Sequence, residues 1–463
     1  MNIVGTSGIE LIRLLQTKKM SSSELQEFFL KRIKKYDNQF NAYVTTVEEK
    51  KNVSNGQPLF GLPIAIKDNF CTKGVRTTAS SKVLNDFIPP YDATVVTKLK
   101  KAGCILLGKT NMDAWAHGSS TETSDFGVTK NPHDLTRVPG GSSGGSAAAV
   151  CAYLAPLAIG SETAGSIRQP AAWCGLVGLK PTYGRVSRYG VIAMGSSLDC
   201  PGSITRTVSD AALLLGILAG HDPYDATSEI ISVPDYLSCL KNKEPLTIGV
   251  SDEYFDNVQP EVSAKVQEAL DVFRKHGHRI KKIKLISPKY AISVYTIIQR
   301  AEVSSNLARY DGIRYGNGRE YLGQEAKRRI MLGTYTLSHG YYDAYYKKAE
   351  IVREVIRADF KRVYKDVDVI IAPTTPMTAL KIGEWEKYPF FGEMMDILNE
   401  PGAIAGLPAI NIPVGLDSNH LPIGMQIIGR HFDEETIVRL AHQYEEETDF
   451  FGVTKQILKK YQD

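Results

Sequence analysis

The sequence contains few cysteines, and no two of them are spaced as a metal-binding or redox motif. Six cysteines are scattered over 463 residues without a C-x-x-C pair. A disulfide framework and a structural zinc site are therefore disfavoured, and we expect no metal site. Most of these cysteines stand beside apolar residues or glycine, as Cys104 does, which is typical of small buried side chains in a reducing compartment.

Long hydrophobic runs and a large net charge are also missing. No uninterrupted apolar run approaches the length that spans a bilayer, and the first residues lack the basic and apolar segments of a signal peptide. The 55 basic and 51 acidic residues leave a formal charge of +4, which over this length does not indicate a nucleic-acid-binding surface. These absences favour a cytoplasmic globular protein that has no membrane partner.

Apolar runs that alternate with amphipathic stretches predict an α/β core. Two helices are expected within residues 7–36, and a capping box at Ser21 and Glu24 opens the second. Further helices are expected at 93–102, 211–218, 260–276, 340–366 and, last in the chain, 434–446. Strands are expected at 43–47, 63–66, 105–107, 246–250, 367–372, 409–414 and 425–428. This alternation favours a substantially parallel sheet within one large domain, residues 1–463.

Residues 139–205 differ from the rest of the chain, because they are dense in Gly, Ser, Thr and Ala and carry few charges. The same segment contains the apolar runs 147–150 and 154–159, which belong inside a protein. Small residues among buried apolar ones indicate close approach of backbones and unusual dihedral angles. We therefore expect a packed segment rather than a flexible linker.

A lysine at a strand end and a serine after a small-residue turn are candidates for amide chemistry. Such chemistry needs a nucleophile, a base and donors for an oxyanion, and none of the nine histidines lies in the Gly/Ser-rich segment. Lys67 follows the apolar run 63–66, where burial would lower its pKa and make it a base. Ser166 follows the turn 160–165, in which backbone N–H groups can converge. From the residues alone, a lysine that merely meets water and a purely structural turn remain open alternatives.

Two adjoining segments resemble the amidase signature. Residues 140–146 read Gly-Gly-Ser-Ser-Gly-Gly-Ser, residues 160–170 follow them, and the similarity continues through 174–185 and over essentially the whole chain. The resemblance implies an amidase-signature fold, with a large, mixed, mostly parallel sheet covered by helices on both faces. It also implies a signature core at about 60–220, with helical and substrate-pocket additions at about 285–400.

Members of that family use a Ser-Ser-Lys triad. The resemblance implies that Lys67 is the base, that Ser142 relays the proton and that Ser166 is the nucleophile. The spacings of 75 and 24 residues between them agree with the family. The resemblance further implies that the peptide bond before Ser142 is cis, a form that is rare outside X-Pro bonds.

The same resemblance places an oxyanion hole at the backbone N–H groups of Thr163, Ala164, Gly165 and Ser166. Two residues here depart from the common Asp-Thr-Gly-Gly-Ser pattern. Alanine at 164 keeps its N–H but resists a positive φ, and Glu162 adds a methylene to a tight site.

Blocks at 304–316, 327–334 and 340–348 narrow the resemblance to the A subunits of aspartyl/glutamyl-tRNA amidotransferases, a branch of that family. In this branch an arginine of the second block and a downstream aspartate hold the α-carboxylate and α-amino groups of free glutamine. The resemblance implies these roles for Arg329 and Asp396, with Tyr295 lining the pocket. Without the resemblance, Arg329 would be interpreted as a charge on a helix surface.

This narrower resemblance implies a glutaminase subunit that supplies ammonia to a partner B subunit. The B subunit would amidate Glu-tRNA(Gln), Asp-tRNA(Asn) or both, and a small C subunit would complete a heterotrimer. ATP and Mg²⁺ would serve the B subunit, because no phosphate-binding loop is visible in this chain, for which we expect no cofactor.

Two other functions remain open. A stand-alone amidase acting on small aliphatic or aryl amides would keep the triad, but it has no use for Arg329 and Asp396. A catalytically silent scaffold subunit would have no need of an intact triad, although Ala164 leaves that function open.

Overall fold

The computed structural model describes residues 3–48, 56–314, 316–387, 391–448 and 452–462, so that Tyr315 of the block at 304–316 lies outside the described residues. Within them, eleven strands form one sheet. Their order across it is β1 (Tyr43–Thr46), β3 (Ile105–Thr110), β2 (Pro63–Lys67), β4 (Ala158–Glu162), β6 (Cys200–Thr205), β5 (Val177–Lys180), β10 (Ala409–Leu416), β11 (Pro422–Ile428), β9 (Val369–Pro373), β7 (Thr247–Ser251) and β8 (Arg279–Ile283).

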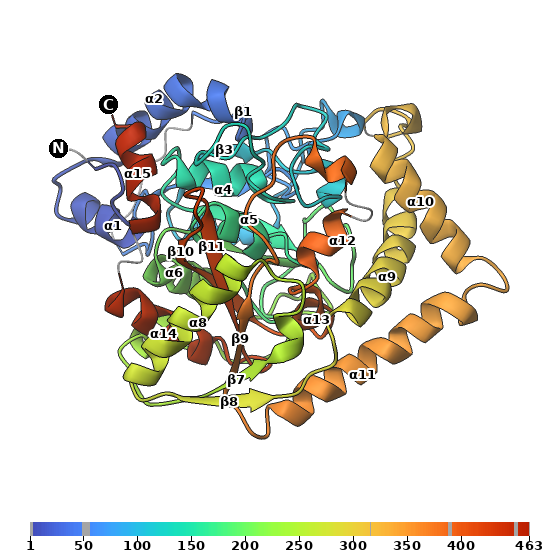
Figure 1. The fold of residues 1–463 in the computed structure, drawn as a ribbon. Helices are drawn as coiled ribbons and strands as arrows, with labels where there is room; N and C mark the ends of the chain where they lie inside the picture. Colours follow the sequence, from blue (N-terminus) through green and yellow to red (C-terminus); the bar gives the residue numbers. More distant parts are fainter. Residues whose placement is uncertain (1–2, 49–55, 315, 388–390, 449–451, 463) are drawn as a thin grey trace.

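Helices surround this sheet, as Figure 1 shows. In the described residues the α-helices are α1 (Gly8–Gln16), α2 (Ser22–Phe40), α3 (Thr94–Lys101), α4 (Gly144–Cys151), α5 (Arg168–Trp173), α6 (Val208–Leu218), α7 (Tyr236–Cys239), α8 (Pro260–Lys275), α9 (Lys289–Leu307), α10 (Gln324–Leu337), α11 (Lys348–Val363), α12 (Phe391–Asp396), α13 (Glu400–Ile404), α14 (Glu434–Glu447) and α15 (Gly452–Lys460). None of these helices is long and apolar enough to cross a membrane.

The structure confirms the predicted mixed α/β sheet. The prediction that most of its strand pairings are parallel is wrong. Among the ten described strand pairings, four are parallel, in the groups β3–β2–β4 and β9–β7–β8. The other six are antiparallel and include the pairings of β5, β6, β10 and β11 between those two groups. Strands β10 and β11 are joined by residues 417–421 alone, and so short a connection cannot make a parallel crossover.

The predicted elements are found close to their expected bounds, with two exceptions. The helix predicted at 340–366 begins instead as a π-helical turn at Asp343–Lys347, which leads into α11. The helix predicted as the last of the chain, α14, is followed by α15. A tertiary contact holds this end of the chain, because Tyr461, just after α15, packs its ring against Tyr36 and Phe40 of α2.

The segment 139–205 is a packed part of the core, as predicted. Helix α4, strand β4 and helix α5 are buried along their whole length. Gly145 shows the reason for small residues here, since a Cβ at this position would lie 2.4 Å from the carbonyl oxygen of Asn111. Five of the six cysteines are buried, Cys239 is partly exposed, and all six are free thiols.

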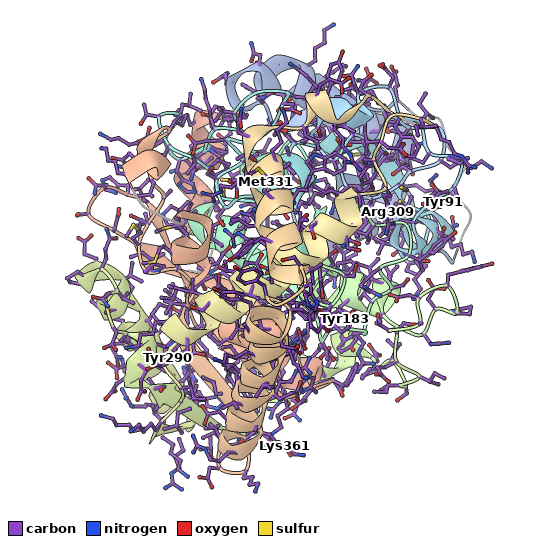
Figure 2. All side chains as sticks on the ribbon, turned by 90° about the vertical axis from the view of Figure 1, so that its right-hand side faces the viewer. Tyr91, Tyr183, Tyr290, Arg309, Met331 and Lys361 are labelled. Atoms are coloured by element: carbon purple, nitrogen blue, oxygen red, sulfur yellow. The ribbon has the colours of Figure 1, made fainter. Side chains whose placement is uncertain are left out.

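Three helices outside the sheet, α9, α10 and α11, fall within the range predicted for the helical and substrate-pocket additions. Figure 2 looks onto the face formed by α9, α10 and α11, with Met331 on α10 and Lys361 on α11. Helix α10 crosses α9 closely, because a Cβ at Gly333 would lie 1.9 Å from the carbonyl oxygen of Arg300. Tyr295 is a buried residue of α9, and Arg329 is a buried residue of α10.

Candidate active site

Lys67 is the last residue of the buried strand β2, and its side chain is fully buried. Its Nζ donates hydrogen bonds to Ser142 Oγ at 2.7 Å and to the carbonyl oxygen of Ser161 at 3.0 Å. The alternative in which Lys67 only marks where a strand meets water is therefore wrong. A lysine in this position can exchange a proton with the serine hydroxyl that it contacts.

Burial lowers the pKa of Lys67 to about 7. The carboxylates of Asp113, Asp199 and Glu162 oppose this shift, because negative charge favours the ammonium form. The loss of hydration outweighs their attraction, since the side chain ends in the protein interior. Near neutral pH a substantial fraction of Lys67 is then uncharged and able to accept a proton.

Ser142 stands in the loop that leads into α4, and the Gly141–Ser142 peptide bond is cis, as predicted. Several hydrogen bonds hold this loop. The N–H of Gly141 donates to Gln169 Oε1 at 2.9 Å, and the N–H of Asp113 donates to the carbonyl oxygen of Ser142 at 3.3 Å. These contacts orient the Ser142 hydroxyl toward Lys67.

Ser166 lies in the connection between β4 and α5 and is 4% exposed. Its carbonyl oxygen accepts a hydrogen bond of 3.2 Å from the N–H of Ser143, which ties it to the loop of Ser142. The hydrogen bonds among the described residues do not include one between the Ser142 and Ser166 hydroxyls. The structure therefore brings the three predicted triad residues to one site through Lys67–Ser142 and through the backbone of Ser166.

Glu162 anchors the connection that carries Ser166. One of its oxygens accepts the N–H groups of Ile167 and Arg168, each at 3.1 Å, and the other accepts Arg168 Nε at 2.9 Å. The Glu162–Arg168 ion pair is buried on both sides. The additional methylene that distinguishes Glu162 from aspartate is accommodated here by an arginine and two backbone donors.

The turn before Ser166 offers free donors for an oxyanion. Among the residues that the structure describes, we find no acceptor bonded to the N–H groups of Ala164, Gly165 and Ser166. The φ of Ala164 is not positive, so the alanine found in place of glycine causes no backbone strain. The Ala164 carbonyl accepts Arg168 Nη2 at 2.8 Å, which fixes the orientation of the turn.

Asp396 lies directly against this turn, at the end of α12. A Cβ at Gly165 would be 2.0 Å from Asp396 Oδ1, so only a residue without a side chain leaves room for the carboxylate. Asp396 is 4% exposed, and Ser119 Oγ donates to its Oδ2 at 2.9 Å. The predicted α-amino-binding residue is therefore placed beside the candidate nucleophile.

Tyr295 and Arg329 complete the group of predicted pocket residues. The hydroxyl of Tyr295 is 3.0 Å from Thr163 Oγ1, which places it at the oxyanion turn. Burial raises the pKa of Tyr295, while the positive charge of Arg329 lowers it. Arg329 is itself buried, and its Nε donates to Glu325 Oε1 at 2.6 Å. The alternative that Arg329 is a charge on a helix surface is therefore wrong.

Sequence reasoning missed two residues that organise this site. Gln169 bridges two loops, because its Oε1 accepts Gly141 N–H and its Nε2 donates to the carbonyl oxygen of Ser119 at 3.1 Å. Asp113 is buried beside the cis peptide, where its charge acts on Lys67. Gln169 stands within the family segment 160–170, in the first turn of α5, so a closer look at the polar residues of that segment would have found it. Within the described residues, no group of His, Cys, Asp and Glu side chains could hold a metal ion.

Comparison with known proteins agrees with this geometry. The family model described as Amidase matches residues 24–438. The A subunit of the glutamyl-tRNA(Gln) amidotransferase from Halothermothrix orenii is 52% identical over 459 residues, which cover 94% of this chain and 96% of that protein.

Solved structures show the same relationship. The A subunit of the glutamyl-tRNA(Gln) amidotransferase from Thermotoga maritima has a TM-score of 0.84 and 43% identity, covering 95% of this chain and 94% of that chain. A peptide amidase from Stenotrophomonas maltophilia has a TM-score of 0.80 and 27% identity, covering 96% and 98%. The chain belongs to the amidase family, whose model it matches over most of its length.

Proposed function

We propose that this chain is the glutamine-hydrolysing subunit of a tRNA-dependent amidotransferase. The observation that carries the proposal is the position of Asp396 against Gly165, next to Ser166, with Arg329 close enough that both charges act on Tyr295. A carboxylate and a guanidinium suit the α-amino and α-carboxylate groups of an amino acid, and a simple aliphatic amide offers neither. Two of the relatives described above are named as subunits of such an amidotransferase.

In the proposed reaction, Ser166 Oγ attacks the side-chain amide carbon of glutamine, and its proton passes through Ser142 to neutral Lys67. The N–H groups of the turn 163–166, from Thr163, Ala164, Gly165 and Ser166, stabilise the oxyanion. The C–N bond then breaks, ammonia leaves with the proton from Lys67, and a γ-glutamyl ester remains on Ser166. Water hydrolyses this ester by the same proton route, so that glutamine and water yield glutamate and ammonia.

The proposed base has a direct consequence for the pH dependence of the reaction. Lys67 must be neutral to accept a proton, and its pKa is lowered to about 7. We therefore expect kcat/KM for glutamine to rise with pH through about 7 and to fall about tenfold for each pH unit well below it. A profile that is flat from about pH 5.5 to about pH 9 would contradict the assignment of Lys67 as the base.

The ammonia is proposed to pass to a partner B subunit that amidates Glu-tRNA(Gln), Asp-tRNA(Asn) or both, with a C subunit completing a cytoplasmic heterotrimer. ATP and Mg²⁺ serve the activation step on the partner. This chain contributes the amide cleavage alone. Support for partner subunits comes from the names of its relatives, which describe them as parts of a larger enzyme.

Replacement of Arg329 by alanine is expected to raise KM for glutamine by about ten- to hundredfold and to change kcat little, because a charge-assisted contact to the carboxylate is lost. The matched control is Arg328→Ala, which removes a neighbouring guanidinium whose side chain is 52% exposed and paired with Glu325. Steady-state assays of ammonia release measure both variants. An unchanged KM in Arg329→Ala would favour the stand-alone amidase.

The two candidate functions are separated by their substrates. Ammonia release is measured from glutamine and from butyramide, with the chain alone and with co-purified partner subunits. We expect glutamine to be the better substrate by at least about 10²-fold in kcat/KM, since butyramide lacks both charged groups of the amino acid. High activity of the chain alone on butyramide would refute the proposed function.

A further inference from the structure

One histidine near the candidate site has no role in the reaction described above. His117 follows the short 3₁₀ turn at Ala114–Ala116 and is 1% exposed. Neither Nδ1 nor Nε2 of its ring has a hydrogen-bond partner among the described residues. Buried polar groups are nearly always paired, because an unpaired one is destabilising, so this ring requires an explanation.

The turn that carries His117 packs against the helix that carries Arg329. Ala114, Trp115 and Ala116 belong to one apolar cluster with Ala326 of α10. Ala326 and Arg329 are three residues apart and are both buried, so they lie on the same face of α10. The contact therefore brings the segment of His117 to the face of α10 from which Arg329 projects.

Two residues after His117, the same segment contacts the other charged group of the pocket. Ser119 Oγ donates to Asp396 Oδ2 at 2.9 Å, and Gln169 Nε2 donates to the Ser119 carbonyl oxygen. The intervening Gly118 is close-packed, because a Cβ there would lie 2.4 Å from Asp113 Oδ1. Residues 117–119 thus run from the surroundings of Arg329 to a direct contact with Asp396.

The charge of the surroundings defines which ligand the ring can accept. Burial lowers the pKa of His117 well below its usual value, and the positive charges of Arg329 and Arg300 lower it further. The ring is therefore neutral, with one N–H donor and one acceptor nitrogen. Because the charges of two guanidinium groups reach the ring, an N–H donor there is suited to an anion, since it adds a hydrogen bond without adding a third buried charge.

We propose that His117 is a substrate-binding residue whose ring N–H donates a hydrogen bond to the α-carboxylate of glutamine, beside Arg329. This inference rests on the proposed function, and it assigns a partner to one of the two unpaired ring nitrogens. It also assigns a separate set of residues to each of the two charged groups of glutamine. Arg329 and His117 bind the carboxylate, and Asp396, held by Ser119, binds the ammonium group.

The test uses the assembled complex with its partner subunits and three amides. Glutamine carries both α-groups, 4-carbamoylbutanoate lacks the amino group, and 4-aminobutanamide lacks the carboxylate. His117→Met has nearly the same volume but no N–H donor, whereas His117→Gln keeps a donor. We expect His117→Met to raise KM about tenfold or more for glutamine and for 4-carbamoylbutanoate, which both carry the carboxylate. The KM for 4-aminobutanamide should change by less than about twofold. His117→Gln is expected to recover part of the lost affinity.

A structural role for His117 predicts a different pattern. In that case all three amides are affected alike, or KM is unchanged while the melting temperature falls, and either result would overturn the inference. The matched control is His278→Met, because His278 is a buried histidine whose ring nitrogens are paired with the Leu246 N–H and the Gln443 side chain. This control is expected to lower the melting temperature without changing KM. A wild-type complex without glutaminase activity would refute the proposed function itself.

Discussion

Ser166→Ala is expected to abolish ammonia release from glutamine, with a loss of at least about 10³-fold in kcat. The alanine keeps the backbone N–H groups of the turn, so glutamine should still bind with a similar dissociation constant. Loss of the hydroxyl removes the proposed nucleophile from the turn. Ammonia release is followed with a coupled assay on the assembled complex, and glutamine binding by calorimetry.

The matched control for this variant is Ser203→Ala. Ser203 is a buried serine of β6 whose hydroxyl has no hydrogen-bond partner among the described residues. Its replacement also removes one buried serine hydroxyl and is expected to leave kcat within about twofold, since this hydroxyl makes no contact that the reaction uses. Residual glutaminase activity above about one per cent in Ser166→Ala, with Ser203→Ala unaffected, would contradict the assignment of the nucleophile.

Lys67→Met is expected to lower kcat/KM by about 10²- to 10⁴-fold, the usual effect of losing a general base. The residual rate should no longer rise through about pH 7, because the titrating group is absent. The fold is expected to persist, since methionine fills a similar volume and relieves the loss of hydration that lowers the pKa of Lys67. A pH–rate profile and a thermal melt of the variant test both statements.

Lys180→Met provides the control for this second prediction. Lys180 is also a fully buried lysine at a strand end, and its Nζ donates to the carbonyl oxygens of Pro181 and Leu407. Its removal is expected to reduce stability but to preserve the rise of kcat/KM through about pH 7. If Lys180→Met abolished the pH dependence and Lys67→Met did not, the base would be wrongly assigned.

Local patterns in the sequence predicted the packing around the centre of the site, and the family resemblance assigned the roles of its residues. An apolar run ending in Lys67 predicts a buried strand end, and the small residues around Ser142 and Ser166 predict packed turns, and the structure contains all three features. The capping box at Ser21 was equally readable, because it depends on two residues three positions apart. Such features form within short stretches and need no information about distant parts of the chain.

The parts that sequence patterns did not reveal depend on contacts between distant segments. The prediction that most strands of the sheet pair in parallel was wrong, because strands of similar apolar composition can pair in either direction. Gln169 and His117 are single polar residues whose positions follow from the packing of loops that are far apart in sequence. Arg329 and Asp396 were reached through family resemblance, since nothing in their own neighbourhoods distinguishes them from surface charges.

Ala164 shows how the structure changes an interpretation based on residue type. An alanine in place of glycine would disturb the oxyanion turn if the position needed a positive φ, which alanine resists. The turn does not require a positive φ at this position, and the essential glycine is Gly165, whose missing side chain leaves room for Asp396. The departure from the family pattern is therefore compatible with catalysis, which disfavours the silent-scaffold alternative.

The central claim is that Ser166 attacks the side-chain amide of glutamine, and covalent trapping tests it most directly. The assembled complex is incubated with a glutamine analogue that carries an electrophile in place of the γ-amide, and the modified peptide is mapped by mass spectrometry. We predict a single adduct on Ser166 that excess glutamine suppresses and that is lost in Arg329→Ala at low analogue concentration. An adduct on another residue, or labelling that glutamine does not suppress, would contradict the account.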